Sequence, residues 1–220
     1  MTSSEHRQHG HVWSIVVGAG SGARFGGMKQ YETLGDTRVI DRSVSAARAV
    51  SDGVVVVVPA GDVEREGGIA GGASRSESVR NGLAQVPADA DIVCVHDAAR
   101  PFASTDLFEQ VIAAVRNGAD AAIPAVPVTD TIKIVASDGS GTVESTPDRS
   151  TLVAVQTPQA FAAVALRRAH ELDDGTSTAT DDAMLVERAG GVVVVVDGES
   201  SNRKITTQDD LEWARREVEQ

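Results

Sequence analysis

The chain has few aromatic residues and a single cysteine. Aromatics make up 3% of its 220 residues, so the hydrophobic 41% consists mainly of Val, Ala, Leu and Ile, which is typical of a buried parallel sheet. Cys94 has no partner for an internal disulfide and lies in an apolar run. This favours a small core residue and a reducing compartment.

Long apolar runs and an excess of positive charge are also missing. Runs such as Val54–Val58 are too short to span a bilayer, and the first residues lack the apolar stretch of a signal peptide, so we expect a cytoplasmic protein without a membrane partner. The net charge of −12 argues against a nucleic-acid partner, which would need a basic surface. Polar residues 1–11 predict a disordered tail before a single domain over residues 12–220.

Short apolar runs alternate with segments of helical character. This alternation indicates right-handed βαβ units and a Rossmann-like α/β fold, with a mostly parallel sheet and helices on both faces. The predicted strands are Val12–Val17, Val54–Val58, Asp91–Val95, Ala121–Pro124, Leu152–Gln156 and Val192–Val196. The predicted helices lie near Val39–Val50, Ser76–Ala84, Asp106–Asn117, Ala162–Glu171, Asp181–Ala189 and Gln208–Val218, the last capped by Thr207.

One segment departs from this alternation. Thr131–Val135 and Gly141–Ser145 flank a turn that contains Asp138-Gly139, which predicts a β-hairpin. We expect it to project as an arm near residues 130–150. An isolated two-stranded hairpin is marginally stable in water, so the arm is expected to pack on a second copy of the chain and form a homodimer.

A glycine-rich loop, Gly18–Lys29, follows the first predicted strand. Ligands bind at the carboxyl ends of the strands in such sheets, and glycines let backbone N–H groups approach an anion. Arg24 and Lys29 in this loop suit a triphosphate. The loop also fits a loose dinucleotide fingerprint, so an NAD-dependent dehydrogenase is an alternative. The two basic residues count against it, and no acidic residue ends the second strand.

The third predicted strand runs into the string His96–Pro101. A carboxylate at the end of a strand is placed to meet hydrated Mg²⁺, which is bound by few carboxylates together with substrate phosphates. Asp97 is therefore the candidate metal residue, directly or through water, and other divalent ions are possible. Arg100 is near enough to pair with Asp97 or with an incoming phosphate, and His96 is expected to be structural.

In their order along the chain these motifs resemble those of the 2-C-methyl-D-erythritol 4-phosphate cytidylyltransferases of isoprenoid biosynthesis by the non-mevalonate pathway. Further matches are Gly71-Gly72 with Arg75 and Ser78-Val79, Pro127 to Lys133, Asp148-Arg149, Gln156 to Gln159, Thr180 to Ala183 and Lys204-Ile205-Thr206. The resemblance covers nearly all of residues 12–215. It implies transfer of CMP from CTP to the methylerythritol phosphate, with release of pyrophosphate, by in-line attack on the α-phosphorus.

The resemblance also implies roles for single residues. The nucleotide would be bound by Gly18, Ala19, Gly20, Gly22, Arg24, Lys29, Gly72, Ser78 and Ala98. The acceptor would be held by Asp97, Arg100, Thr131, Arg149, Thr157 and Lys204, of which Thr131 and Arg149 would reach in from the arm of a dimer mate. The catalytic residues would be Arg24, Lys29, Lys204 and Arg149.

Three features depart from the family pattern. Met28 stands where the family usually has proline, the spacing from Arg24 to Lys29 is shorter than the commonest form, and Ala73 stands where many members have aspartate near the base. Because Ala73 has no polar side chain, we expect selectivity for the base to depend on backbone contacts. Two alternatives remain: a ribitol 5-phosphate cytidylyltransferase, which shares the loops and the reaction, and a non-enzymatic nucleotide-binding module, which would not require all the charged site residues together.

Overall fold

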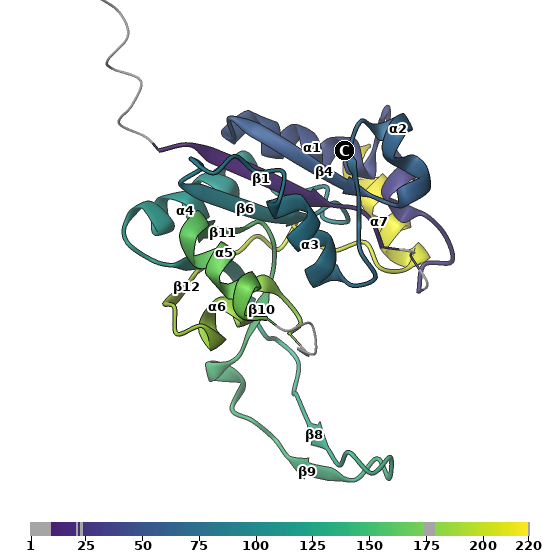
Figure 1. Ribbon diagram of the computed structural model, residues 1–220. Helices are drawn as coiled ribbons and strands as arrows, with labels where there is room; N and C mark the ends of the chain where they lie inside the picture. Colours follow the sequence, from purple (N-terminus) through teal and green to yellow (C-terminus); the bar gives the residue numbers. More distant parts are fainter. Residues whose placement is uncertain (1–9, 21, 23, 174–178, 220) are drawn as a thin grey trace, which may run out of the picture.

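A mostly parallel sheet forms the centre of the protein (Figure 1). The computed structural model describes residues 10–20, 22, 24–173 and 179–219. Over these residues the sheet has eight strands in the order β10-β7-β11-β6-β1-β4-β5, and β12 pairs with β7 outside this path. The strands are β1 (Val12–Val17), β4 (Gly53–Val58), β5 (Ile69–Ala70), β6 (Ile92–Asp97), β7 (Ala121–Pro127), β10 (Val153–Val155), β11 (Gln159–Ala162) and β12 (Val193–Asp197).

Helices cover both faces of this sheet, as predicted. One core cluster packs α1 (Val39–Val50) and α4 (Thr105–Arg116) against Val16 and its neighbours, and the other packs α3 (Arg75–Leu83), α5 (Ala163–Leu172) and α6 (Asp182–Arg188) against Ile15. Ile15 and Val16 belong to different clusters because successive side chains of a strand point to opposite faces. The sheet is therefore buried on both sides, which explains its nearly continuous apolar strands.

A third, smaller cluster lies around α7 (Gln208–Val218), which begins at the predicted cap Thr207. The cluster joins α7 to Phe25, within the glycine-rich loop, and to Leu34 in the small β2 (Thr33–Leu34) and β3 (Thr37–Arg38) pair. Further short elements are η1 (Lys29–Tyr31), η2 (Ala60–Asp62), α2 (Val63–Glu66) and η3 (Arg149–Thr151). The helix α7 therefore packs against the glycine-rich loop through Phe25.

Two strands run against the predicted parallel direction. β10 and β11 are antiparallel to β7, and the sequence pattern missed β11 altogether. Parallel neighbours need a crossover connection, usually a helix, whereas the chain returns from β7 through the arm alone. Val155 pairs with Ala125 of β7, and Ala160 pairs with Ala122 of β7. The segment from Val155 to Ala160 is therefore longer than the stretch of β7 that it faces. The resulting break holds Gln156, Thr157 and Pro158.

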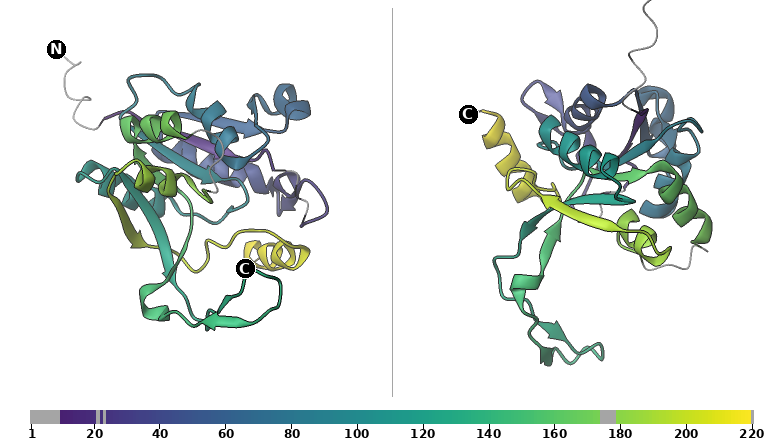
Figure 2. Two further views of the ribbon diagram at one scale, coloured as in Figure 1. Left: turned by 60° about the horizontal axis from the view of Figure 1, so that its bottom comes forward. Right: turned by 90° about the vertical axis from the view of Figure 1, so that its left-hand side faces the viewer.

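The hairpin appears as β8 (Ile134–Val135) and β9 (Val143–Ser145), which pair antiparallel in a sheet of their own. Figures 1 and 2 show it at the end of a long extension that leads away from the body. Its apolar side chains Ile134, Val135 and Val143 are about half exposed. These side chains make an apolar surface on the arm.

Part of the predicted tail, residues 1–9, lies outside the described residues. His11 is in the structure, where its backbone N–H donates to the Asp91 carboxylate at 2.7 Å. None of the described helices has both the length and the apolar composition to cross a membrane.

Candidate active site

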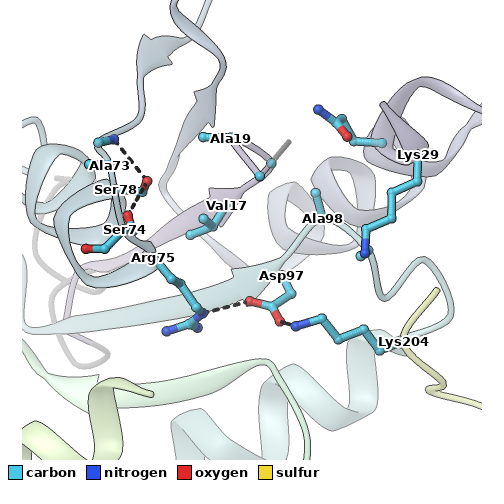
Figure 3. A pocket seen from close by; sticks show the side chains of 15 residues that line it. Val17, Ala19, Lys29, Ala73, Ser74, Arg75, Ser78, Asp97, Ala98 and Lys204 are labelled. Carbon is cyan, nitrogen blue, oxygen red and sulfur yellow. Dashed lines mark hydrogen bonds and ion pairs between the residues drawn. The ribbon is translucent and has the colours of Figure 1, made fainter. Parts of the chain in front are cut away.

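A cavity of about 440 Å³ opens at the carboxyl ends of β1 and β6. Figure 3 shows its lining side chains, which come from the glycine-rich loop, the start of α3, the end of β6 and the segment before α7. The predicted site residues that line it are Gly18, Ala19, Gly20, Lys29, Gly72, Ser78, Asp97, Ala98 and Lys204. Strand ends far apart in the sequence meet here, as expected for a ligand site in this type of sheet.

The glycine-rich loop leaves β1 with close backbone packing. Gly18 donates its N–H to the Val57 carbonyl at 2.7 Å. Gly22 has a φ of +65°, and a Cβ at this position would lie 1.9 Å from the Gly27 carbonyl oxygen. Glycine is therefore required for the loop to close at this short spacing.

The opposite wall of the cavity is the turn that leads into α3. Gly72 donates its N–H to Ser78 Oγ at 3.0 Å, and the hydroxyl donates to the Ser74 carbonyl at 2.8 Å. The Ala73 N–H is bound by the Glu77 carboxylate at 2.7 Å. The turn is thus held by α3 itself, although Ala73 has no polar side chain.

Asp97 is the buried charge at the centre of the site, with an exposed fraction of 8%. Arg75 Nε lies 3.1 Å from Oδ1, and Lys204 Nζ lies 2.5 Å from Oδ2 (Figure 3). Burial alone would raise the pKa of Asp97, but the two cations hold it well below its usual value. The carboxylate is therefore ionised, and both its oxygens have partners.

The role of Arg75 was not predicted beyond its place in a motif. Its Nη1 lies 2.6 Å from Asp182 Oδ2, and Asp182 Oδ1 lies 3.0 Å from His170 Nε2. Burial would raise the pKa of Asp182, but the hydrogen bond from His170 and the charge of Arg75 keep it lowered. The Thr-Asp-Asp string was visible in the sequence, but its contact with α3 depends on the packing of α6.

Thr157 connects Asp97 to a buried imidazole. The Asp97 N–H donates to Thr157 Oγ1 at 3.0 Å, and this hydroxyl lies 3.1 Å from His96 Nδ1. His96 Nε2 lies 3.2 Å from the Arg100 carbonyl, so the ring donates there and accepts from Thr157. Burial lowers the pKa of His96 to about 4. The imidazole is neutral with both nitrogens engaged, which supports a structural role.

A second cavity of about 220 Å³ adjoins the first and shares Arg75, Asp97 and Lys204 with it. Arg100 and Thr157 also line it, as do Val155, Gln156, Gln159, Thr180 and Asp181. The Arg100 guanidinium donates to the carbonyls of Asn202 at 2.8 Å and Val155 at 3.3 Å. Arg75 and Lys204, rather than Arg100, form the ion pairs with Asp97.

Lys29 faces other cations. Burial lowers its pKa, and the charges of Lys204 and Arg24 lower it further. Across the described part of the chain, no carboxylate forms an ion pair with Lys29. Arg24 is exposed and lines neither cavity, but it is close enough to act on the charge of Lys29. Such a group of like charges is stabilised by an anionic ligand with several negative oxygens.

Residues 12–220 match the model of a protein family described as "IspD: 2-C-methyl-D-erythritol 4-phosphate cytidylyltransferase". The chain belongs to this family. It is therefore an enzyme of nucleotidyl transfer, which sets aside the dehydrogenase and the non-enzymatic binding module.

The chain is similar to other proteins over nearly its whole length. One relative, named 2-C-methyl-D-erythritol 4-phosphate cytidylyltransferase, from Rhodococcus jostii (strain RHA1), is 46% identical over 223 residues, covering 96% of each chain. The solved structure of a 4-diphosphocytidyl-2C-methyl-D-erythritol synthase from Anaerococcus prevotii DSM 20548 has a TM-score of 0.84 at 30% identity, covering 96% of this chain and 100% of that one. The structure of a 2-C-methyl-D-erythritol 4-phosphate cytidylyltransferase from Thermus thermophilus has a TM-score of 0.79 at 30% identity, covering 94% and 98%.

Besides Arg24, three residues that the family resemblance assigns to the site line neither of the two cavities. Gly22 closes the glycine-rich loop without lining either of them, and Thr131 and Arg149 lie on the extension that carries the arm. The Arg149 guanidinium donates to the Thr129 carbonyl at 2.8 Å, within the same extension. The prediction that Thr131 and Arg149 act in the site of a dimer mate stays a prediction.

The donor set is suited to a metal that arrives with its substrate. Among the residues that the structure describes, no group of three or more His, Cys, Asp or Glu side chains could hold a metal ion. Asp97 supplies one ionised carboxylate at the junction of the two cavities. Mg²⁺ fits such a site, because it commonly takes one or two carboxylates and completes its shell with phosphate oxygens and water.

We expect acid to weaken the fold through His96. Its folded pKa of about 4 lies below the ordinary 6.5, so the unfolded chain takes up this proton first. Stability from the neutral ring is full above pH 6.5 and is lost as the pH falls from 6.5 to 4. The loss should be on the order of 3 kcal/mol. Urea unfolding across this window should show a shallower decline for His96→Asn, and equal slopes would contradict the prediction.

Proposed function

We propose that this protein transfers the cytidylyl group of CTP to 2-C-methyl-D-erythritol 4-phosphate, giving 4-diphosphocytidyl-2-C-methyl-D-erythritol and pyrophosphate. The observation that carries the proposal is a cationic cavity in an acidic protein. Lys29 and Lys204 line it, Lys29 has its pKa lowered by burial and by neighbouring cations, and the chain as a whole has a net charge of −12. The family and the names of its full-length relatives agree with this activity.

The nucleotide occupies the larger cavity in this proposal. The cytosine and ribose lie against Gly72 and Ser78, with Ala98 on the cavity wall. Backbone N–H groups of Ala19 and Gly20 meet the triphosphate, and Arg24 and Lys29 supply its positive partners. Gly18, whose N–H is bound by Val57, and Gly22 shape the loop that carries them. Charge builds up on the phosphate oxygens in the transition state of nucleotidyl transfer. Fixed cations therefore bind the transition state more strongly than the substrate, which lowers the barrier.

The acceptor occupies the smaller cavity, where Arg100 and Lys204 hold its phosphate. Thr157 lines the wall of this cavity, with its hydroxyl hydrogen bound by His96. One oxygen of this phosphate forms a bond to the α-phosphorus of CTP, and the bond from that phosphorus to the bridging oxygen of the β-phosphate breaks. Pyrophosphate leaves with the bonding electrons. The attacking oxygen is already anionic, so the step needs no general base, which agrees with a His96 that has no free nitrogen.

Asp97 would hold Mg²⁺, directly or through water, at the junction of the two cavities. When bound, the ion would neutralise negative charge on the triphosphate. Lys204 and Arg75 keep Asp97 ionised, which is the state that a metal requires. Other divalent ions of similar preference for oxygen could substitute.

We also propose a homodimer in which the arm of each chain completes the site of its mate. The support is the apolar surface of the arm, whose side chains Ile134, Val135 and Val143 are about half exposed and need a partner. Arg149 and Thr131 would then meet the acceptor across the interface. Because CTP is a nucleotide of the cell interior, a cytoplasmic location follows from the reaction.

CTP should be used far better than UTP. A base pocket that pairs with the cytosine amino group leaves polar groups unpaired with uracil, at a cost of about 1–3 kcal/mol, or roughly 10- to 100-fold in kcat/KM. Pyrophosphate release measured with CTP, UTP, ATP and GTP, with either methylerythritol phosphate or ribitol 5-phosphate as acceptor, tests both substrates. Equal use of UTP would rule out base selectivity, and a preference for ribitol 5-phosphate would replace the proposed acceptor.

Lys29→Ala should lower kcat roughly 100-fold or more without unfolding the protein, because it removes a cation that stabilises transition-state charge. The measurement is turnover at saturating CTP, with thermal unfolding as the test of folding. Arg215→Ala is a matched control, since Arg215 forms an exposed ion pair with Glu32 just after the same turn. Near-normal turnover of Lys29→Ala would exclude Lys29 as a transition-state ligand.

Mixing two inactive variants should restore activity if the sites are shared. In a mixed dimer of Arg149→Ala and Lys29→Ala chains, one site carries both defects and the other carries neither. The mixed dimer should therefore reach about half of the wild-type rate when the two sites act independently. Lys29→Ala mixed with Lys204→Ala is the matched negative control, because both lysines line one cavity of the same chain. A monomer in solution, or no recovery after confirmed exchange, would contradict shared sites.

A further inference from the structure

Tyr31 is the single tyrosine of the chain and ends the η1 turn that begins at Lys29. Its hydroxyl donates to Asp62 Oδ2 at 2.8 Å. Burial raises the pKa of the phenol, and the hydrogen bond and charge of Asp62 raise it further, to about 12. Gln30, between Lys29 and Tyr31, is buried and lines the nucleotide cavity. Tyr31 therefore anchors one end of the η1 turn, and Lys29 forms the other end.

Two guanidinium groups face the Tyr31 ring. The Arg65 guanidinium carbon lies 4.4 Å from the ring centroid, and that of Arg38 lies 5.6 Å away, both within the range of cation–π attraction. Arg65 also pairs with Asp62 at 3.1 Å. Both arginines bind Glu66, at 2.7 Å from Arg65 and 2.8 Å from Arg38, and the Glu66 side chain is only 6% exposed. We call Tyr31, Asp62, Arg65, Glu66 and Arg38 the tyrosine clamp.

The clamp joins the η1 turn to the start of α1, to η2 and to α2. Tyr31 comes from η1, Arg38 from the residue before α1, Asp62 from the end of η2, and Arg65 and Glu66 from α2. The ion pairs are partly buried and form a network, which makes them stronger than isolated surface pairs. The η1 turn is thus tied to two helices of the fold.

On the other side of Lys29, the buried side chain of the loop is Phe25, in the cluster around α7. Two glycines and the exposed Met28 lie between Phe25 and Lys29, and the Lys29 N–H donates to the Gly27 carbonyl at 3.0 Å. The charges of Lys204 and Arg24 repel Lys29, and those of Asp97 and Asp210 attract it less strongly. An anchor close to Lys29 opposes this repulsion.

We propose that Tyr31 is a positioning residue, and that the tyrosine clamp holds Lys29 over the nucleotide cavity against the repulsion of its cationic neighbours. The inference rests on the proposed role of Lys29 as a phosphate ligand. It assigns to Tyr31 and Asp62 an effect on turnover, although neither lines the cavities described above.

Tyr31→Phe and Asp62→Ala each remove the hydrogen bond between the two side chains. Each should lower kcat about 10-fold or more, since a small displacement of a catalytic group has a large effect on rate. KM for CTP should change less, because the glycine-rich backbone and the base-binding turn are untouched. Because Asp62 also pairs with Arg65, the double variant Tyr31→Phe/Asp62→Ala should be no worse than Asp62→Ala alone. Arg215→Gln, which breaks an exposed ion pair beside the same turn, should keep wild-type turnover.

A second comparison separates this inference from the role of Lys29 itself. In a Lys29→Ala background, Tyr31→Phe should cause no further loss, because its effect acts through Lys29. Near-normal turnover of Lys29→Ala would overturn the phosphate-binding role of Lys29. If Lys29→Ala is disabling while Tyr31→Phe keeps full turnover, or lowers it equally with and without Lys29, the positioning role alone is overturned.

The single tyrosine also gives a direct readout of the clamp. At a pH near 10.0, where an ordinary tyrosine is half ionised, the wild-type phenol should remain largely protonated. Asp62→Asn should gain phenolate, because it removes the carboxylate that disfavours a second negative charge. Near-ultraviolet phenolate absorbance, or NMR of ring-labelled tyrosine, measures this without turnover. Equal ionisation in both proteins would show that the clamp does not form in solution.

Discussion

The site is organised around one buried carboxylate. Asp97 cannot stay ionised at the end of a core strand unless cations compensate it, because an unpaired buried charge costs several kcal/mol. Arg75 from α3 and Lys204 from the segment before α7 do so, and Asp182 and His170 hold Arg75 in turn. The need to neutralise Asp97 thus draws together four elements that are distant in the sequence. The two cavities meet at this point, where the reacting phosphates would have to meet.

The broken strand β10–β11 supplies the second half of the arrangement. Because its pairing with β7 is interrupted between Val155 and Ala160, Thr157 reaches the Asp97 backbone and the buried His96 instead of continuing the ladder. The same break leaves Val155 and Gln156 on the wall of the smaller cavity. An irregularity in the sheet therefore forms the wall of the smaller cavity, the proposed acceptor site, while the regular parallel strands end at the larger cavity, the proposed nucleotide site.

Charge in this protein is distributed unevenly. The chain is strongly acidic, yet its cavity is lined by cations, and Lys29 has no carboxylate partner in the part that the structure describes. Lys204 is neutralised by Asp97, whereas Lys29 depends on its neighbours in the loop and on whatever anion enters. The tyrosine clamp would explain how an exposed glycine-rich loop can keep such a residue in place.

The sequence by itself determined the local structure and the family. The bounds of β1, α1 and α7 were predicted correctly, because apolar periodicity and the Thr207 cap are local signals. Most of the residues predicted to bind the nucleotide line the larger cavity, since glycine and lysine in a loop after a strand are local signals of an anion site. Only the tertiary structure decided the antiparallel direction of β10 and β11 and the partners of Asp97. Those depend on how distant strands and helices pack, and a buried charge selects its partners by position in space rather than by spacing along the chain.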